Sequence, residues 1–173
     1  MMRRGKLTAI LIGALCGVSI QARASELPAW QATRSTDMLT QQPVCLLESV
    51  TRTIDDGRTS TPMHLVFDGQ SFVVITRSKL DLSYPQLGLQ VDDLPVHTID
   101  RVYKQTHAVF DKDADSIRKE FIKGHKVYIA LGFWPTWPKS HTVVTPFSLL
   151  GFRAAYNEFQ ACQKQNPNTF QQK

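Results

Sequence analysis

The side chains in this 173-residue sequence with the chemistry for catalysis or metal binding are five histidines, fifteen acidic residues and three cysteines. No two histidines lie two or four residues apart, the spacings that place two imidazoles on one metal ion. The sequence also has no GxSxG elbow, phosphate-binding loop, dinucleotide fingerprint or HExxH motif. We therefore expect no enzymatic activity, metal or cofactor. The alternative left open is a fold that gathers two histidines and an acidic residue in one pocket. The five histidines are His64, His97, His107, His125 and His141.

Three aspartates at alternate positions, Asp111, Asp113 and Asp115, resemble part of a calcium-binding loop. The run lacks the glycine of the sharp turn and the bidentate acid that ends such a loop. Acidic residues in a first helical turn are stabilised by the helix dipole. Helix capping is therefore the preferred interpretation of this run.

Residues 1–24 have the three parts of a secretory signal peptide. A charged start is followed by a largely apolar stretch, residues 7–20, and by Ala22-Arg23-Ala24 as a cleavage signal before Ser25. The apolar stretch is shorter than the ~20 residues of a membrane-spanning helix, so we expect no integral membrane segment in the mature chain. Lipidation at Cys16 is disfavoured, because Leu15 stands where a small residue normally precedes a lipidated cysteine. We expect a periplasmic protein, or alternatively a secreted or cell-surface one.

Removal of this leader changes the charge of the chain. From Ser25 onward, 16 Lys and Arg stand against 15 Asp and Glu, a net charge of +1 rather than the +5 of the whole sequence. No cluster of Lys and Arg remains of the kind that binds the phosphate backbone. We therefore expect no nucleic-acid partner.

The mature chain keeps two cysteines, Cys45 and Cys162. In an exported protein such a pair favours one disulfide. The bond closes a loop of about a hundred residues and joins the two ends of the domain, which would contribute ~4–5 kcal/mol in the chain-entropy model. The alternative is two buried free thiols.

A rigid aromatic connection, Trp134-Pro135-Thr136-Trp137-Pro138, is the candidate binding site. Trp134 and Trp137 would present aromatic surface to a partner, with Lys139 as a polar neighbour. The alternative is that both tryptophans cap one end of the core. Their side-chain accessibility distinguishes the two.

Alternating apolar residues and turn signals predict the strands that position these residues. The clearest hairpin is residues 63–75, with Asp68-Gly69 as a two-residue type I′ turn. Leu65 then opposes Phe72 and Met63 opposes Val74 on the core face, and the other face holds His64, Val66 and Val73. The other predicted strands are 44–51, 80–91, 99–110, 125–133 and 140–147. The segment 80–91 is expected to be an edge strand, because Pro85 and Gly88 interrupt it. Residues 25–42 are predicted to be an extended lead-in whose Trp30 docks on the body.

Two helices are predicted late in the chain. The first covers residues 111–123, capped by Asp113 and ended by Gly124. The second lies within 145–163, with Ser148 as N-cap. Its apolar face is formed by Phe152, Ala155, Tyr156, Phe159 and Cys162.

Many short strands and two late helices predict one mainly β domain over residues 25–165, a β-sandwich with helical additions, followed by a disordered tail, 166–173. The alternative is an α+β roll. A small apolar or cyclic ligand between sheet and helix would contact Phe121, Tyr128 and Phe159, although these positions are equally typical of core.

The C-terminal half carries a family resemblance. Its residues are Gly124 and Val127 at the start of an alternating strand, then Phe147-Ser148-Leu149-Leu150-Gly151-Phe152, Ala154-Ala155-Tyr156 and Cys162, and upstream Trp30 before a Val-Cys-Leu strand at 44–46. In these features the chain resembles the invasion-associated locus B family of exported bacterial proteins. It lacks a cysteine pair that members often carry before the 111–123 helix.

The resemblance implies an immunoglobulin-like β-sandwich with a C-terminal helix, in the periplasm or at the cell surface. It also implies an association with host-cell invasion in some pathogens and no known enzymatic activity. We therefore expect a non-enzymatic envelope protein that binds an envelope or host protein or another envelope component. The alternative function is a periplasmic small-ligand-binding protein.

Overall fold

The computed structural model describes residues 28–36, 41–135 and 141–165. The signal peptide and tail predicted from the sequence lie outside these ranges. The strands are β1 Trp30–Thr36, β2 Pro43–Ser49, β3 Arg52–Asp55, β4 Ser60–Phe67, β5 Phe72–Thr76, β6 Gly88–Val91, β7 His97–Thr98, β8 Arg101–Tyr103, β9 His107–Phe110, β10 Lys126–Leu131 and β11 Val143–Ser148; the helices are α1 Ala114–Lys123 and α2 Phe152–Gln165.

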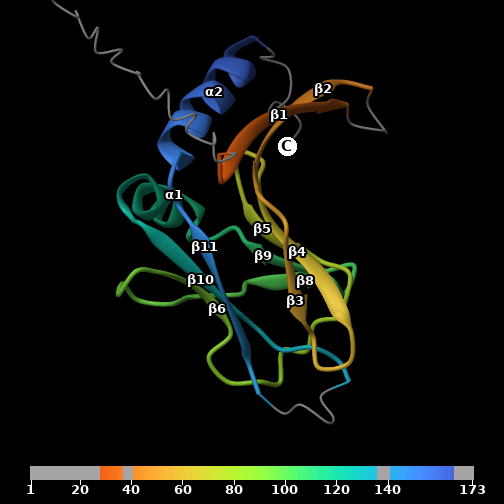
Figure 1. Ribbon diagram of the computed structural model, residues 1–173. Coiled ribbons are helices and arrows are strands. Elements are labelled where there is room, and N and C mark those ends of the chain that lie inside the picture. Colours follow the sequence, from red (N-terminus) through yellow and green to blue (C-terminus); the bar gives the residue numbers. More distant parts are fainter. Residues whose placement is uncertain (1–27, 37–40, 136–140, 166–173) are drawn as a thin grey trace, which may run out of the picture.

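The strands form two antiparallel sheets. The larger sheet has the order β1-β2-β4-β5-β9-β8, with β3 paired to β4, and the smaller has the order β11-β10-β6-β7. Figure 1 shows the two helices together at one end, where α2 packs against β1 and β2. This arrangement confirms the predicted β-sandwich with a short helix and a C-terminal helix, and not the α+β roll.

The core lies between the sheets and the helices and is rich in aromatic residues. Trp30, Phe72, Phe121, Phe147, Phe152 and Phe159 are all nearly or fully buried. The rings meet mostly edge-on or tilted, as in the pair Trp30 and Phe152, whose centroids are 4.9 Å apart, an arrangement favoured by aromatic quadrupoles. Trp30 thus docks on the body as predicted, but as the first residue of a strand in the larger sheet.

The β4–β5 hairpin forms where the sequence predicts it, with a register two residues different. Phe67 pairs with Phe72 and Leu65 with Val74, because the turn is centred on Gly69-Gln70 rather than Asp68-Gly69. The Asp68 carboxylate accepts the N–H groups of Gln70 and Ser71, both at 2.8 Å, and this side-chain turn competes with the simple two-residue loop. A shift of two leaves every side chain on its predicted face.

The predicted single strand 99–110 is a hairpin of β8 and β9. Lys104 and Gln105 have positive φ values of 51° and 62°, so the chain reverses there without the glycine or asparagine that usually marks such a turn. The interrupted segment 80–91 likewise yields one strand, β6, and an isolated bridge between Leu80 and Phe133.

Both helices begin later than the sequence predicts. Asp113 precedes α1 but makes no side-chain capping bond; its carboxylate lies 3.3 Å from His97 Nδ1 instead. Ser148 ends β11 and is not the N-cap of α2, because α2 begins at Phe152. Gly124 does end α1, and its N–H donates to the Glu120 carbonyl.

The predicted disulfide is present between Cys45 of β2 and Cys162 of α2, with a Cα–Cα distance of 6.1 Å and a sequence separation of 117 residues. Cys162 lies on the helix face that also carries the buried residues Phe152, Ala155 and Phe159. The bond therefore ties the last helix to the larger sheet, as the sequence indicates.

Candidate functional site

The outer face of the larger sheet, turned away from the smaller sheet, is apolar at its centre. Val66, Val73 and Val109 occupy one cross-strand row on β4, β5 and β9, and Val66 and Val109 are only 8% and 3% exposed. The outer face of a sandwich is ordinarily polar, because alternate residues of each strand face water. This face is therefore unusual, because it buries valines that do not belong to the core between the two sheets.

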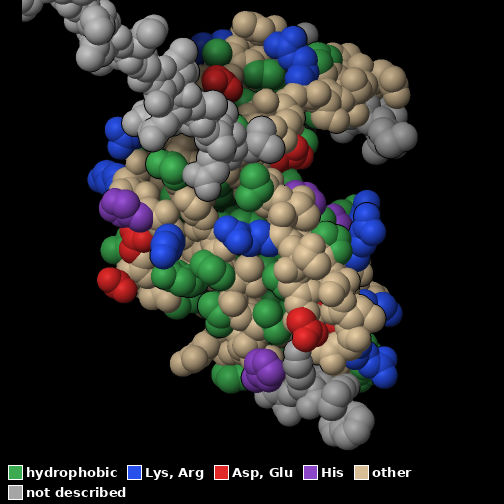
Figure 2. Space-filling model, in the orientation of Figure 1, with side chains coloured by type: hydrophobic (Ala, Val, Ile, Leu, Met, Phe, Trp, Pro, Cys, Tyr) green, Lys and Arg blue, Asp and Glu red, His purple; other side chains and the backbone are tan. Residues whose placement is uncertain are grey.

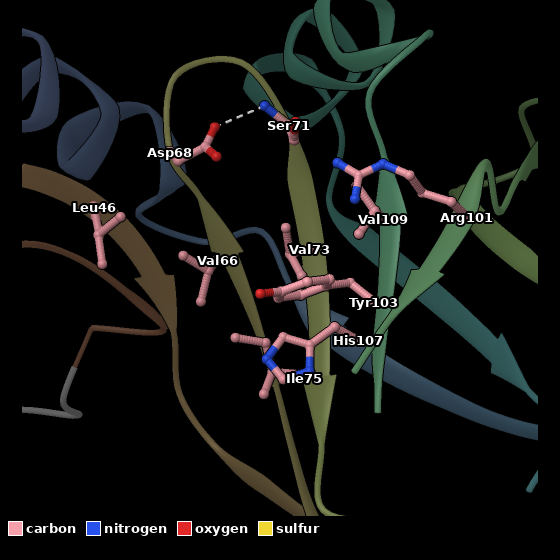
Figure 3. A pocket seen from close by; sticks show the side chains of 10 residues that line it. All are labelled: Leu46, Val66, Asp68, Ser71, Val73, Ile75, Arg101, Tyr103, His107 and Val109. Carbon is pink, nitrogen blue, oxygen red and sulfur yellow. Dashed lines mark hydrogen bonds between the residues drawn. The ribbon is translucent and has the colours of Figure 1, made fainter. Parts of the chain in front are cut away.

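These valines form the floor of a recess that we call the hollow. It has a volume of about 420 Å³ and ten lining residues: Leu46, Val66, Asp68, Ser71, Val73, Ile75, Arg101, Tyr103, His107 and Val109. Figure 3 shows Tyr103 reaching from β8 across the floor toward β4, with Leu46 on the opposite side and the Asp68–Ser71 turn at one end. The recess thus has an aliphatic floor and a polar rim.

Segments at the two edges of the larger sheet form the walls of the hollow. In Figure 1 the β1–β2 hairpin extends out from the body, and Figure 2 shows the surface recessed beneath it. Leu46 stands on this hairpin, paired with Thr33 of β1. The opposite wall is Tyr103 of β8, the other edge strand, paired with His107.

The charged groups of the rim already have partners within the protein. Arg101 Nε donates to Asp111 Oδ2 at 3.1 Å, and Asp68 accepts the two backbone N–H groups of its own turn. Lys104, which does not line the hollow, has its ammonium 5.2 Å from the Tyr103 ring centroid. A ligand in the hollow therefore meets mainly apolar surface.

Two histidines belong to this face. His107 lines the hollow and His64 is its neighbour across Ile75, since Ile75 pairs with both. Burial lowers the pKa of His64 below its usual 6.5, although Glu48 opposes the shift. Burial also lowers the pKa of His107, and Lys104 and His64 act in the same direction. Both rings are therefore uncharged at neutral pH.

Of the predicted binding residues the structure describes Trp134, which does not line the hollow. Trp134 is 61% exposed and contributes to a shallow recess with Lys79, Leu80, Asp81, Leu82 and Gln105. Its exposure argues against a role in capping the core. Trp137 and Lys139 fall outside the described residues, so the joint site of the three residues stays a prediction.

The predicted ligand position between sheet and helix is filled by core. Phe121 and Phe159 are each 1% exposed, and Tyr128 lies on the outer face of the smaller sheet, where it lines a separate recess with Val96 and Val144. These three residues therefore do not form one pocket.

The acidic residues do not converge as a calcium site would require. Asp111 pairs with Arg101, Asp113 with His97 and Asp115 with Arg118. His97 also contacts Glu120 at 2.9 Å through its other ring nitrogen, which joins β7 to α1. Within the described part of the chain, no group of three or more His, Cys, Asp or Glu is arranged to hold a metal ion, and no helix there is long and apolar enough to cross a membrane.

Sequence reasoning missed the hollow, although part of its signal is present in the β4–β5 hairpin. That hairpin has Val66 and Val73 on its second face, opposite the core residues Leu65 and Val74. When both faces of a hairpin are apolar, other parts of the protein or a ligand are expected to cover both faces. The alternation alone does not reveal that distant segments, β2 and β8, supply the walls.

Comparison with solved structures gives a match of fold. No protein-family model matches the chain, and no curated protein does. The chain resembles the crystal structure of invasion associated protein B from Bartonella henselae, with a TM-score of 0.51 and 19% sequence identity over 80% of this chain and 95% of that one. The likeness spans nearly all of that structure and shows that the two share their overall fold.

Proposed function

We propose that the protein is an exported, non-enzymatic binding module of the cell envelope. The observation that carries the proposal is the hollow, because buried valines on the outer face of a sandwich serve no purpose in the core and mark an interaction site. The signal-peptide pattern and the Cys45–Cys162 disulfide support an oxidising compartment outside the cytoplasm. The periplasm is the compartment that the proposal assigns.

The name of the structural neighbour extends the proposal to contact between the bacterium and a host cell. Fold alone does not carry function, so this part rests on a shared architecture and on the exported character of the chain. The partner would be an envelope or host protein, or another envelope component.

A second surface, at Trp134, favours a protein partner. Trp134 and Leu82 are 61% and 52% exposed, and both line the recess beside Lys79 and Gln105. Exposed aromatic side chains of this kind are enriched among the residues that dominate protein interfaces. The two surfaces are separable, because Trp134 does not line the hollow.

Affinity capture tests the proposal. The exported protein would be immobilised and exposed to envelope extract and, separately, to host-cell membrane extract. Val73→Asp places a charge in the hollow, Trp134→Ala removes the exposed ring, and Val144→Asp is a matched control on the outer face of the smaller sheet. A component retained by the wild type and the control but lost by either surface variant supports a binding module and identifies its surface. Equal recovery of a component by all four proteins contradicts the assignment of both surfaces, and the absence of any component retained by the wild type contradicts the binding module.

A further inference from the structure

The hollow is suited to one class of occupant. We propose that it binds an uncharged apolar molecule with a ring system or short hydrocarbon body, and that acid releases the molecule by charging His64 and His107. This inference rests on the proposed function and adds to it the chemistry of the ligand and a condition for its release.

The size of the hollow favours a small molecule. Its volume of about 420 Å³ falls within the ~300–1,000 Å³ of small-molecule sites. Leu46 and Tyr103 bound it on opposite sides, so a ligand is held between two walls as well as on the floor. An aliphatic floor with an aromatic wall suits a hydrocarbon or ring system.

The rim indicates that the ligand carries no charge. Arg101 is engaged by Asp111, and the charges of Asp68 and Arg101 have opposite signs at the same recess. An anionic ligand would meet Asp68, and a cationic one would meet Arg101. Burial of an uncompensated charge is costly, whereas burial of an uncharged apolar body is favourable.

The histidines make binding depend on pH. His107 faces Tyr103, Thr106 and Ile75, with Lys104 close by. His64 faces Ile75 and interacts electrostatically with Glu48 and His107. Only Glu48 in this group carries a charge that would compensate an imidazolium. Acidification therefore adds positive charge beside an apolar ligand and weakens its binding.

Two fluorescent dyes with the same ring system test the ligand class. Phenylnaphthylamine is uncharged, and anilinonaphthalene sulfonate carries a negative charge on a matching body. At neutral pH we expect saturable binding of the uncharged dye to the exported protein, and about tenfold weaker binding of the sulfonate. Equal affinities would overturn the assignment of an uncharged ligand.

Variants locate the dye. Val73→Asp should weaken binding of the uncharged dye at least about tenfold, and Tyr103→Ser, at a side chain that is 51% exposed, should weaken it without unfolding the protein. Val144→Asp should bind like the wild type. Retained binding in both hollow variants, with melting temperatures close to the wild type, would show that the dye lies elsewhere and contradict the inference.

A pH titration tests release. From about pH 7.5 to about pH 5 the wild type should lose affinity for the uncharged dye, whereas His64→Gln/His107→Gln should keep its affinity. A loss of the same size in the double variant, or no loss in the wild type, would overturn the role of the histidines.

Two other occupants give distinct results. Phe170 is the one large apolar residue in the sequence 166–173; if Phe170→Ser binds the dye and the wild type does not, that segment fills the hollow. If the wild type is a dimer in light scattering and Val73→Asp is a monomer, the hollow is an interface between copies. Either result contradicts the small-molecule inference. A failed dye experiment combined with capture through Trp134 leaves the binding module standing and removes only the ligand assignment.

Discussion

The indole N–H of Trp30 donates a hydrogen bond to the carbonyl oxygen of Ser148, 2.8 Å away and 118 residues later in the chain. Trp30 begins the larger sheet, and Ser148 ends the last strand of the smaller sheet. The same indole packs edge-on against Phe121 of α1 and Phe152 of α2. One side chain therefore joins both sheets and both helices.

Substitution of Trp30 should lower the free energy of unfolding in two separable steps. Trp30→Phe removes the hydrogen-bond donor and leaves the Ser148 carbonyl without it, at a cost of about 1–3 kcal/mol. Trp30→Ala also removes the ring contacts and should cost about 3–5 kcal/mol. Urea denaturation measures both, with Trp134→Ala at an exposed position as the control. A Trp30→Ala variant as stable as Trp134→Ala would contradict this role.

Removal of the disulfide should destabilise the protein through its unfolded state. The bond spans 117 residues, and closure of so long a loop contributes ~4–5 kcal/mol in the chain-entropy model. We expect Cys45→Ser/Cys162→Ser to unfold at a much lower denaturant concentration than the oxidised wild type. Reduced wild type is the matched control and should resemble the double variant. Equal midpoints for oxidised and reduced wild type would argue against this contribution.

The sequence predicts most of the sandwich because its signals are local. The core face of β4 and β5 follows from alternation, and the buried face of α2 follows from the spacing of Phe152, Ala155 and Phe159. The missed details depend on side-chain bonds to the backbone. Asp68 moves the centre of its turn by one residue, and Ser148 bonds the N–H of Leu150 instead of the first turn of α2.

The hollow was less predictable because it is assembled from three separate segments: β2, the β4–β5 hairpin and the β8–β9 hairpin. Leu46, Val66 with Val73, and Tyr103 with His107 come together only through the order of strands β2, β4, β5, β9 and β8. Sequence patterns indicate which face of a strand each residue lies on, but they do not indicate which strands pair with one another. The exposure of Trp134, in contrast, agrees with the surface role that the composition of its segment indicates.

The two histidines of the outer face should make stability fall in mild acid. Burial lowers the pKa of both His64 and His107 in the folded protein. The unfolded chain therefore binds protons more readily below pH 6.5, and unfolding becomes easier as the pH falls from that value through the folded pKa values. Well above pH 6.5 these histidines are uncharged in both the folded and the unfolded protein, so their contribution to stability is fully present there.

Denaturation at about pH 8 and about pH 5.5 measures this effect. The wild type should lose more stability between the two than His64→Gln/His107→Gln, whose side chains do not titrate. Both proteins share the remaining histidines and carboxylates, so the difference between them isolates this pair. An equal loss in both would contradict the prediction.

Gly88 should tolerate no side chain, because the backbone of β7 lies close to it. A Cβ at Gly88 would lie 2.2 Å from the backbone oxygen of His97, and its φ of +155° is unfavourable for other residues. Gly88→Ala should therefore displace β7 and cost about 3 kcal/mol. Gly151→Ala is the control: its φ is +86°, but its Cβ would meet no atom within 4 Å, so it should cost only the backbone strain of about 1 kcal/mol. Equal losses in thermal denaturation would show that strain, and not the approach of the His97 carbonyl, requires glycine at position 88.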